Sequence, residues 1–277
     1  MPDNITQGGH WEQHALNWKH FGSPLRPSGE DVNWMSKILA DQPHDTNRVV
    51  LLGVTPELVR MAWPRGIRLL AVDQSSGMIR NVWNASSPPL WAEVICGDWE
   101  SVPLPDASAD TVIGDGVLVF FSYPQGVQRL MREVRRLLHP QGLWLLRVFI
   151  RPDQPETLAQ LHDDLLAGRI GSFHAYKWRL AMALQPSLAR GVRLADVWQT
   201  WRRWVPDAAS LAAQTGWPRE AINTINAYRD SQSVYYYPSL QELRQTLALA
   251  FEVIAQHHPS YELGERCPLL ALRPLSR

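Results

Sequence analysis

The chain has 277 residues, 45% of them hydrophobic, and its 27 basic residues balance 27 acidic ones. This length suits one elaborated domain, or a core that carries an inserted subdomain, and provides enough apolar side chains for a large core. A net charge of zero argues against a general affinity for nucleic acid or for an anionic membrane surface, so we expect neither partner.

Two further features indicate where the protein works. The cysteines, Cys96 and Cys267, are isolated in the sequence, which argues against a structural zinc site and favours a reducing compartment. Residues 1–20 are polar and charged, without the apolar core of a signal peptide, and no apolar run is long enough to cross a membrane. The sequence therefore predicts a cytoplasmic protein.

Residues 1–46 are predicted to form an N-terminal helical segment. One short helix covers residues 11–18, and a second runs from the N-cap Ser28 to about residue 40, because apolar side chains recur there at helical spacing. The simplest interpretation is an appendage that packs on the core. The alternative is a lid over a ligand, with Trp18, Phe21 and Arg26 facing that ligand.

Apolar strands then alternate with helices over residues 47–150, which indicates a Rossmann-like α/β core with a mostly parallel sheet and helices on both faces. The predicted strands cover residues 49–52, 68–72, 91–96, 109–114 and 143–150. The predicted helices cover residues 57–63, 75–82 and 126–138. Residues 234–277 return to this core with a helix over 240–250 and an antiparallel edge pair of strands, 251–255 and 269–272.

Residues 151–233 differ from the core, because no convincing strand pattern occurs in them. We predict a helical insertion that caps an acceptor site, with prolines separating some of its helices. The predicted helices cover residues 156–167, 172–184, 194–204, 208–215 and 219–230.

Acidic residues follow three of the predicted strands. Because the carboxyl ends of parallel strands meet at one edge of a sheet, Asp73, Asp98 and Asp115 are expected to gather there with Gly53. Each aspartate alone is more often a solvated turn residue or an N-cap. Together they predict a ligand site, and Asp73 lies about 20 residues after Gly53, where a carboxylate binds a ribose diol. A glycine-poor turn favours a mononucleotide-like ligand over a dinucleotide.

Four segments resemble motifs of the class I S-adenosylmethionine (SAM)-dependent methyltransferases: residues 73–79, 96–99, 109–118 and 132–142. The resemblance implies SAM as cofactor and S-adenosylhomocysteine as product. It also implies that Asp73 binds the ribose and that the segment ending in Asp98 and Trp99 reads the adenine. The implied cofactor-binding set is Gly53, Val54, Thr55, Glu57, Asp73, Gln74, Met78, Asp98, Trp99, Asp115, Gly116 and Leu118.

The first turn departs from the pattern of this family. Leu51 stands where the family has an acidic residue, and Thr55 and Glu57 stand where it has its second and third glycines. Side chains at these positions are expected to alter the usual cofactor pose. A specific hypothesis is that Glu57 takes over the role of the missing carboxylate toward the ammonium group of SAM.

The resemblance places the acceptor site between residues 11–30 and the insertion, where many aromatic residues occur. We expect a small aromatic or apolar acceptor in contact with Trp18, Phe21, Arg26, Tyr176 and Trp201. The same aromatic residues could instead form the core of the insertion or the face of a homodimer. His14, His162 and His174 are possible bases, and no catalytic or metal-ligand pattern is evident.

Two other functions fit the sequence. The altered first turn is compatible with a catalytically silent SAM-binding protein that acts as a regulator or scaffold. The same fold could also hold a different nucleotide-type ligand.

Overall fold

The computed structural model describes residues 9–42, 47–89 and 91–276, so parts of the predicted N-terminal segment lie outside the described residues. Seven strands form one sheet in the order β3-β2-β1-β4-β5-β9-β8. Strands β1 to β5 are parallel, and β9 and β8 add an antiparallel pair at one edge, as predicted. The strands are β1 (Arg48–Leu52), β2 (Arg68–Asp73), β3 (Ala92–Cys96), β4 (Ala109–Asp115), β5 (Leu138–Arg147), β8 (Phe251–His257) and β9 (Leu269–Pro274).

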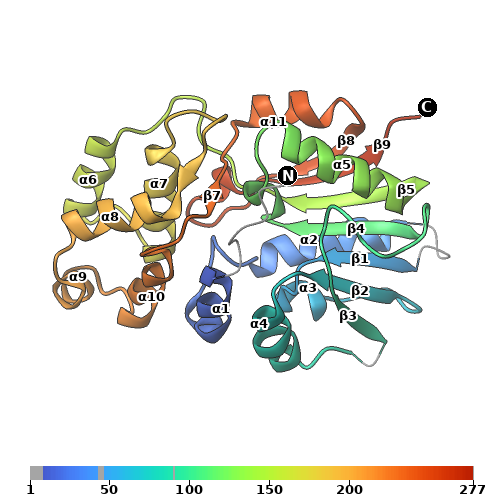
Figure 1. Cartoon of the computed structure of the whole chain (residues 1–277), viewed down its shortest axis with the longest axis horizontal. Coiled ribbons are helices and arrows are strands. Elements are labelled where there is room, and N and C mark those ends of the chain that lie inside the picture. The colour runs from blue at the N-terminus through green and yellow to red at the C-terminus, as the bar shows by residue number, and fades with distance from the viewer. Residues whose placement is uncertain (1–8, 43–46, 90, 277) are drawn as a thin grey trace.

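Helices cover both faces of this sheet (Figure 1). Alternate residues of β1 enter different cores, because successive side chains of a strand point to opposite faces. Val49 and Leu51 pack with α2 (Gly29–Ala40), α3 (Pro56–Val59) and the segment that follows β2, which comprises α4 (Ser76–Met78) and a π-helical turn, Ile79–Trp83. Val50 and Leu52 pack with α5 (Gln125–Leu137) and α11 (Leu240–Leu247). This burial on both faces explains the continuous apolar sequence of the strand.

Several predicted boundaries were wrong by a few residues. The helix expected over residues 57–63 covers only Pro56–Val59, and Pro64 disfavours a helical conformation at Trp63, the last residue of the predicted range. Strand β5 begins at Leu138 rather than at residue 143, since Leu138 already pairs with Ala109 across an irregular register. Ser28 caps α2 with a reciprocal capping box to Asp31, as the N-cap prediction required.

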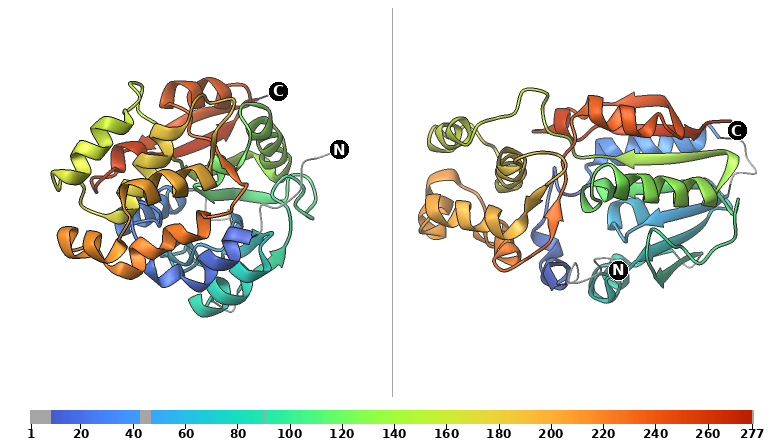
Figure 2. Two further views of the ribbon diagram at one scale, coloured as in Figure 1. Left: turned by 60° about the vertical axis from the view of Figure 1, so that its left-hand side comes forward. Right: turned by 45° about the horizontal axis from the view of Figure 1, so that its top comes forward.

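The insertion forms a second helical layer beyond the strand ends (Figures 1 and 2). Its helices have their own apolar core and comprise α6 (Leu158–Leu166), α7 (Phe173–Leu184), α8 (Leu194–Trp204), α9 (Ala208–Thr215) and α10 (Arg219–Asn223), with a 3₁₀ turn, Thr224–Tyr228. The expectation of no strand was wrong, because β6 (Val192–Arg193) pairs antiparallel with β7 (Val234–Tyr235). A strand of two residues is too short to show an alternating apolar pattern in the sequence.

Helix α1 (Gly9–Leu16) lies between the sheet and the insertion, and it contacts α4 beside the sheet and the 3₁₀ turn of the insertion (Figures 1 and 2). On one side, the Glu12 carboxylate accepts a hydrogen bond from the Gly77 N–H at 2.9 Å. On the other side, the His10 Nε2 atom and the Tyr235 hydroxyl share a hydrogen bond of 2.9 Å. The N-terminal segment therefore joins the two parts of the chain. No helix among the described residues has the length and apolar character needed to cross a membrane.

Candidate functional site

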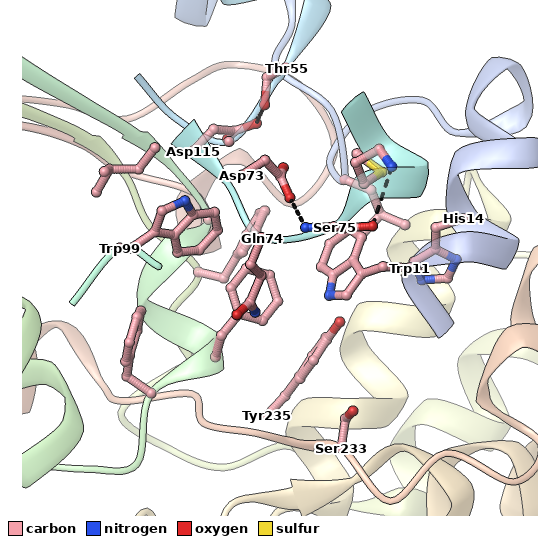
Figure 3. A pocket seen from close by; sticks show the side chains of 18 of the residues that line it. Trp11, His14, Thr55, Asp73, Gln74, Ser75, Trp99, Asp115, Ser233 and Tyr235 are labelled. Atoms are coloured by element: carbon pink, nitrogen blue, oxygen red, sulfur yellow. Dashed lines mark hydrogen bonds between the residues drawn. The ribbon is translucent and has the colours of Figure 1, made fainter. Parts of the chain in front are cut away.

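A cavity of about 970 Å³ opens at the carboxyl ends of the parallel strands. Figure 3 shows Asp73 and Asp115 on one side of the cavity and Ser233 and Tyr235 across from them, with Trp11 and His14 of α1 along the side between these two groups. This volume is near the upper end of the roughly 300–1,000 Å³ typical of small-molecule sites, so it can hold more than one small ligand. Thirteen of the predicted residues line it: Trp18, Phe21, Arg26, Gly53, Val54, Thr55, Asp73, Gln74, Met78, Asp98, Trp99, Asp115 and Gly116.

Asp73, the last residue of β2, has one carboxylate oxygen that accepts a hydrogen bond and one that accepts none from the described residues. Its Oδ1 accepts a hydrogen bond of 2.8 Å from the Ser75 N–H, and no other described residue donates to the carboxylate. Burial raises the pKa of Asp73 to about 6, although the bond from Ser75 opposes this shift. A buried carboxylate with one free oxygen and no cationic partner is suited to accept hydroxyl groups of a ligand.

The first turn is fixed by one backbone carbonyl. The Val72 carbonyl accepts hydrogen bonds from the Gly53 N–H at 2.7 Å and from the Trp99 indole N–H at 2.6 Å. Gly53 has a φ of +102°, which only glycine adopts without strain. Thr55, at the position of a missing glycine, donates its hydroxyl to Asp115 Oδ2 at 3.5 Å. The turn is therefore ordered despite its altered sequence.

Gly53→Ala is expected to lower the free energy of unfolding by about 1–2 kcal/mol, because the alanine would be held at positive φ. Its Cβ would meet Trp99 Cζ2 at an ordinary 3.8 Å, so backbone strain and not overlap causes the loss. Urea unfolding measures it. Gly29→Ala is the control, because its Cβ would enter open space at a helix start. Equal stability of the two variants would contradict this prediction.

Asp115, the last residue of β4, is paired with Arg147, the last residue of β5. The Arg147 Nε donates to Asp115 Oδ1 at 2.6 Å, and both side chains are nearly inaccessible. The same guanidinium donates to the carbonyls of Pro24 at 2.6 Å and Leu25 at 3.3 Å. Although burial opposes its charge, the Asp115 carboxylate raises the pKa of Arg147 above its ordinary value. This ion pair fixes the N-terminal segment to the strand ends.

Comparison with known families identifies this core. A family model described as "Methyltransferase domain" matches residues 52–146, the segment that holds the first turn, Asp73 and Asp115. Residues 52–146 therefore form a methyltransferase domain of the class I SAM-dependent type. No curated protein sequence has significant similarity to the chain.

Solved structures share the fold of nearly the whole chain. The CcbJ methyltransferase from Streptomyces caelestis aligns with a TM-score of 0.57 at 13% identity, covering 98% of this chain and all of its own. Burkholderia thailandensis 1,6-didemethyltoxoflavin-N1-methyltransferase, solved with 1,6-didemethyltoxoflavin and S-adenosylhomocysteine, aligns with a TM-score of 0.51 at 14% identity, covering 99% and 94%. A Rhodobacter sphaeroides protein described as a Zn-dependent alcohol dehydrogenase aligns with a TM-score of 0.59 at 14% identity, covering 98% and 100%. These identities establish the fold alone.

Four predicted site residues lie outside the cavity wall. Leu118 is buried in the core between the sheet and α5, because it lies in the turn that follows β4. Tyr176 and Trp201 are buried in the core of the insertion, so the alternative that these aromatics pack among themselves holds for them. Glu57 is the fourth. The aromatic wall of the cavity is therefore formed by other residues.

Glu57 forms an ion pair with Arg26, so its carboxylate reaches the N-terminal segment and not the cavity. Arg26 also donates to the Trp18 carbonyl at 3.2 Å and stacks over the Trp18 ring at 5.4 Å. The other oxygen of Glu57 is buried without a partner. In this conformation Glu57 is occupied by Arg26, which leaves its hypothesised role toward the SAM ammonium without structural support.

The end of the cavity beside the insertion contains polar residues that sequence reasoning missed. Tyr235 and Ser233 line it, and both bind the His10 ring, at 2.9 and 3.3 Å. Trp11 lines it beside His14, with their ring centroids 5.4 Å apart. Residues three apart on a helix share a face, so this spacing could have paired them from the sequence.

The other two histidines considered as bases differ in position. His174 lies behind Phe21, its ring stacked at 5.6 Å, and its Nε2 bonds to the His20 carbonyl. His162 packs against Trp204 within the insertion. Only His14 of the three lines the cavity. Across residues 9–42, 47–89 and 91–276, no group of three or more His, Cys, Asp or Glu side chains is arranged to hold a metal ion.

Proposed function

We propose that the chain is an active SAM-dependent methyltransferase that acts on a small, planar, mostly apolar molecule. The observation that carries the proposal is the continuity of the cavity, whose wall runs from Asp73 at the sheet edge to Tyr235 at the insertion. A methyl transfer needs the donor and the acceptor in one water-poor space, in line with each other. A cavity with one end suited to the cofactor and the other to an acceptor favours an active enzyme over a protein that binds SAM without catalysis.

The residues at the strand ends fit a SAM molecule. The free oxygen of Asp73 would accept the ribose hydroxyls, and the backbone of Gly53 allows close approach at the first turn. The exposed Asp98 and the fixed Trp99 would border the adenine. When bound, SAM supplies an electrophilic methyl group on a sulfonium, which needs no metal or further activation by the protein. The chain contributes position and exclusion of water.

The acceptor end explains the proposed substrate class. Trp11, Phe21, Trp178 and Tyr235 supply flat apolar surfaces, and such walls suit a planar molecule. The Burkholderia thailandensis relative in fold holds 1,6-didemethyltoxoflavin, which is a small-molecule precedent for this architecture. The N-terminal segment and the insertion, as lid and cap, would enclose this acceptor.

Calorimetric titration with SAM, S-adenosylhomocysteine and NAD is expected to give binding of the first two ligands and none of the third. Transfer of a radiolabelled methyl group to a panel of planar phenols, amines and thiols then tests activity. Binding without transfer to any member would favour the silent regulator or scaffold. If neither SAM nor S-adenosylhomocysteine bound to the protein, the proposed function would be refuted.

A further inference from the structure

Lys177 of α7 is a buried cation behind the acceptor end of the cavity. Its side chain has no exposed surface, and it is one of only three lysines in the chain. Its ammonium donates to the Thr224 hydroxyl at 3.3 Å and lies over the rings of Phe21 at 4.8 Å and Tyr228 at 5.1 Å. Both rings line the cavity. The positive charge is therefore separated from the cavity by aromatic rings.

No described carboxylate forms an ion pair with this lysine. The titratable groups that face it are His10 and His14 from α1, His174 from α7, and Tyr228 from the neighbouring turn. Burial lowers the pKa of Lys177 to about 7. A buried ammonium without a counter-ion is costly, and an anion in its neighbourhood would offset that cost.

The histidines nearby are held in their neutral form. Burial and the charge of Lys177 lower the pKa of His10 to about 4 and that of His14 well below its ordinary value. His14 lines the cavity, and its Nδ1 is buried without a hydrogen-bond partner. A neutral imidazole carries one N–H donor and can bind an oxyanion without adding charge. His14 is thus a free polar group beside a positive potential.

The carboxylates that line the cavity come from the other end. Asp73, Asp98, Glu100 and Asp115 lie at the sheet edge, where a cationic sulfonium cofactor would bind. Glu100 is paired with Arg129 and Asp115 with Arg147, so Asp73 and Asp98 are the carboxylates there without a described cationic partner. The described wall near His14 and Tyr235 contains aromatic and hydroxyl groups but no carboxylate. The cavity is therefore electrostatically divided, with one end suited to a cation and the other to an anion.

We infer that the acceptor is a weak organic acid, such as a phenol or an enol, which binds as its anion between His14 and the Lys177 charge. The inference rests on the proposed function for the reaction and specifies its acceptor. The acceptor O–H releases its proton to solvent on binding. The resulting oxyanion forms a bond to the methyl carbon while the carbon–sulfur bond breaks, and the sulfonium becomes a neutral thioether. Lys177 is a positioning residue in this scheme, and His14 contacts the acceptor.

The ionisation of 4-nitrophenol in the full-length protein tests this inference, because its phenolate is coloured. With saturating protein, the ionisation midpoint of the bound probe is expected to fall by about 1 pH unit or more, the size typical of a nearby opposite charge. Lys177→Met should return most of this shift, and His14→Leu part of it. Removing a buried unpaired charge is not expected to unfold the protein. The exposed Lys37 supplies the control, Lys37→Met, which should leave the midpoint unchanged.

The neutral analogue 4-nitroanisole separates charge from shape. It should bind the wild type and Lys177→Met equally, whereas a merely structural lysine would weaken both probes together. Failure of 4-nitrophenol to bind at millimolar concentration, or binding with an unshifted midpoint in the wild type, would overturn the inference. SAM binding is measured separately by calorimetry, so loss of the proposed function and loss of the anion site are distinguishable.

Discussion

Arg147→Met is expected to lower the free energy of unfolding by about 3–5 kcal/mol, the cost typical of leaving one partner of a buried ion pair unpaired. The variant leaves the Asp115 carboxylate buried without its partner and removes the donor to the Pro24 and Leu25 carbonyls. The N-terminal segment would lose its attachment to the strand ends. Chemical denaturation measures the loss, and limited proteolysis should show earlier cleavage near residue 24.

Two further variants define the cause. Arg151→Met is the matched control, because Arg151 pairs with Glu242 at 3.0 Å on a partly exposed surface, where such pairs contribute at most about 1 kcal/mol. The double variant Arg147→Met with Asp115→Asn also removes the unpaired charge of Asp115, so it should recover a large part of the lost free energy of unfolding. If Arg147→Met were no less stable than Arg151→Met, the buried pair would not hold the site together.

Asp73→Asn is expected to weaken SAM binding by about 10- to 100-fold while it stabilises the protein without ligand. The affinity falls because hydrogen bonds to a charged group contribute about 1.5–3 kcal/mol. The stability rises because the ionised Asp73 is buried without a cation, and asparagine keeps the bond from Ser75. Titration calorimetry and thermal melting measure the two effects on the same sample.

The stability effect has a defined pH dependence. The pKa of Asp73 is about 6 in the folded protein and about 4 in an unfolded chain, so the native state binds more protons between these values. Stability of the wild type should therefore fall as pH rises from 4 to 6, and the advantage of Asp73→Asn should reach about 2–3 kcal/mol at pH 8 and vanish near pH 4. SAM affinity of the wild type should weaken as pH falls below 6.

Asp153→Asn, at an exposed position in the loop after β5, is the control for this series. It should change neither the melting temperature nor the affinity for SAM. A stabilised Asp73→Asn variant with undiminished affinity would mean that Asp73 does not bind the cofactor. A destabilised variant would mean that its carboxylate has a structural partner.

The positions of the residues at the sheet edge could be predicted from the sequence, because they depend on where the apolar strands end and on the direction of the strands. Apolar runs of strand length end at Asp73 and Asp115, and the common direction of parallel strands brings these ends together. The same logic placed Gly53 in the first turn. These three placements follow from the local apolar pattern and from the direction of the strands, and both can be read from a single sequence.

Contacts between remote segments could not be predicted in this way. Arg147 stands in an apolar strand, a visible anomaly, but its pairing with Asp115 and its bonds to the Pro24 segment depend on the packed structure. Glu57 lies on the predicted turn, yet its carboxylate forms an ion pair with Arg26, which is remote in the sequence. Nothing in the helical pattern of residues 172–184 distinguishes Lys177, because its burial depends on the aromatic rings of Phe21 and Tyr228 that pack around it.

The most direct test of the whole account is a crystal structure with S-adenosylhomocysteine. We expect the ribose hydroxyls on Asp73, the adenine beside Trp99, and the thioether sulfur facing the part of the cavity lined by His14 and Tyr235. S-adenosylhomocysteine bound elsewhere, or with its sulfur directed away from the aromatic end, would contradict the assignment of one cavity to both the cofactor and the acceptor.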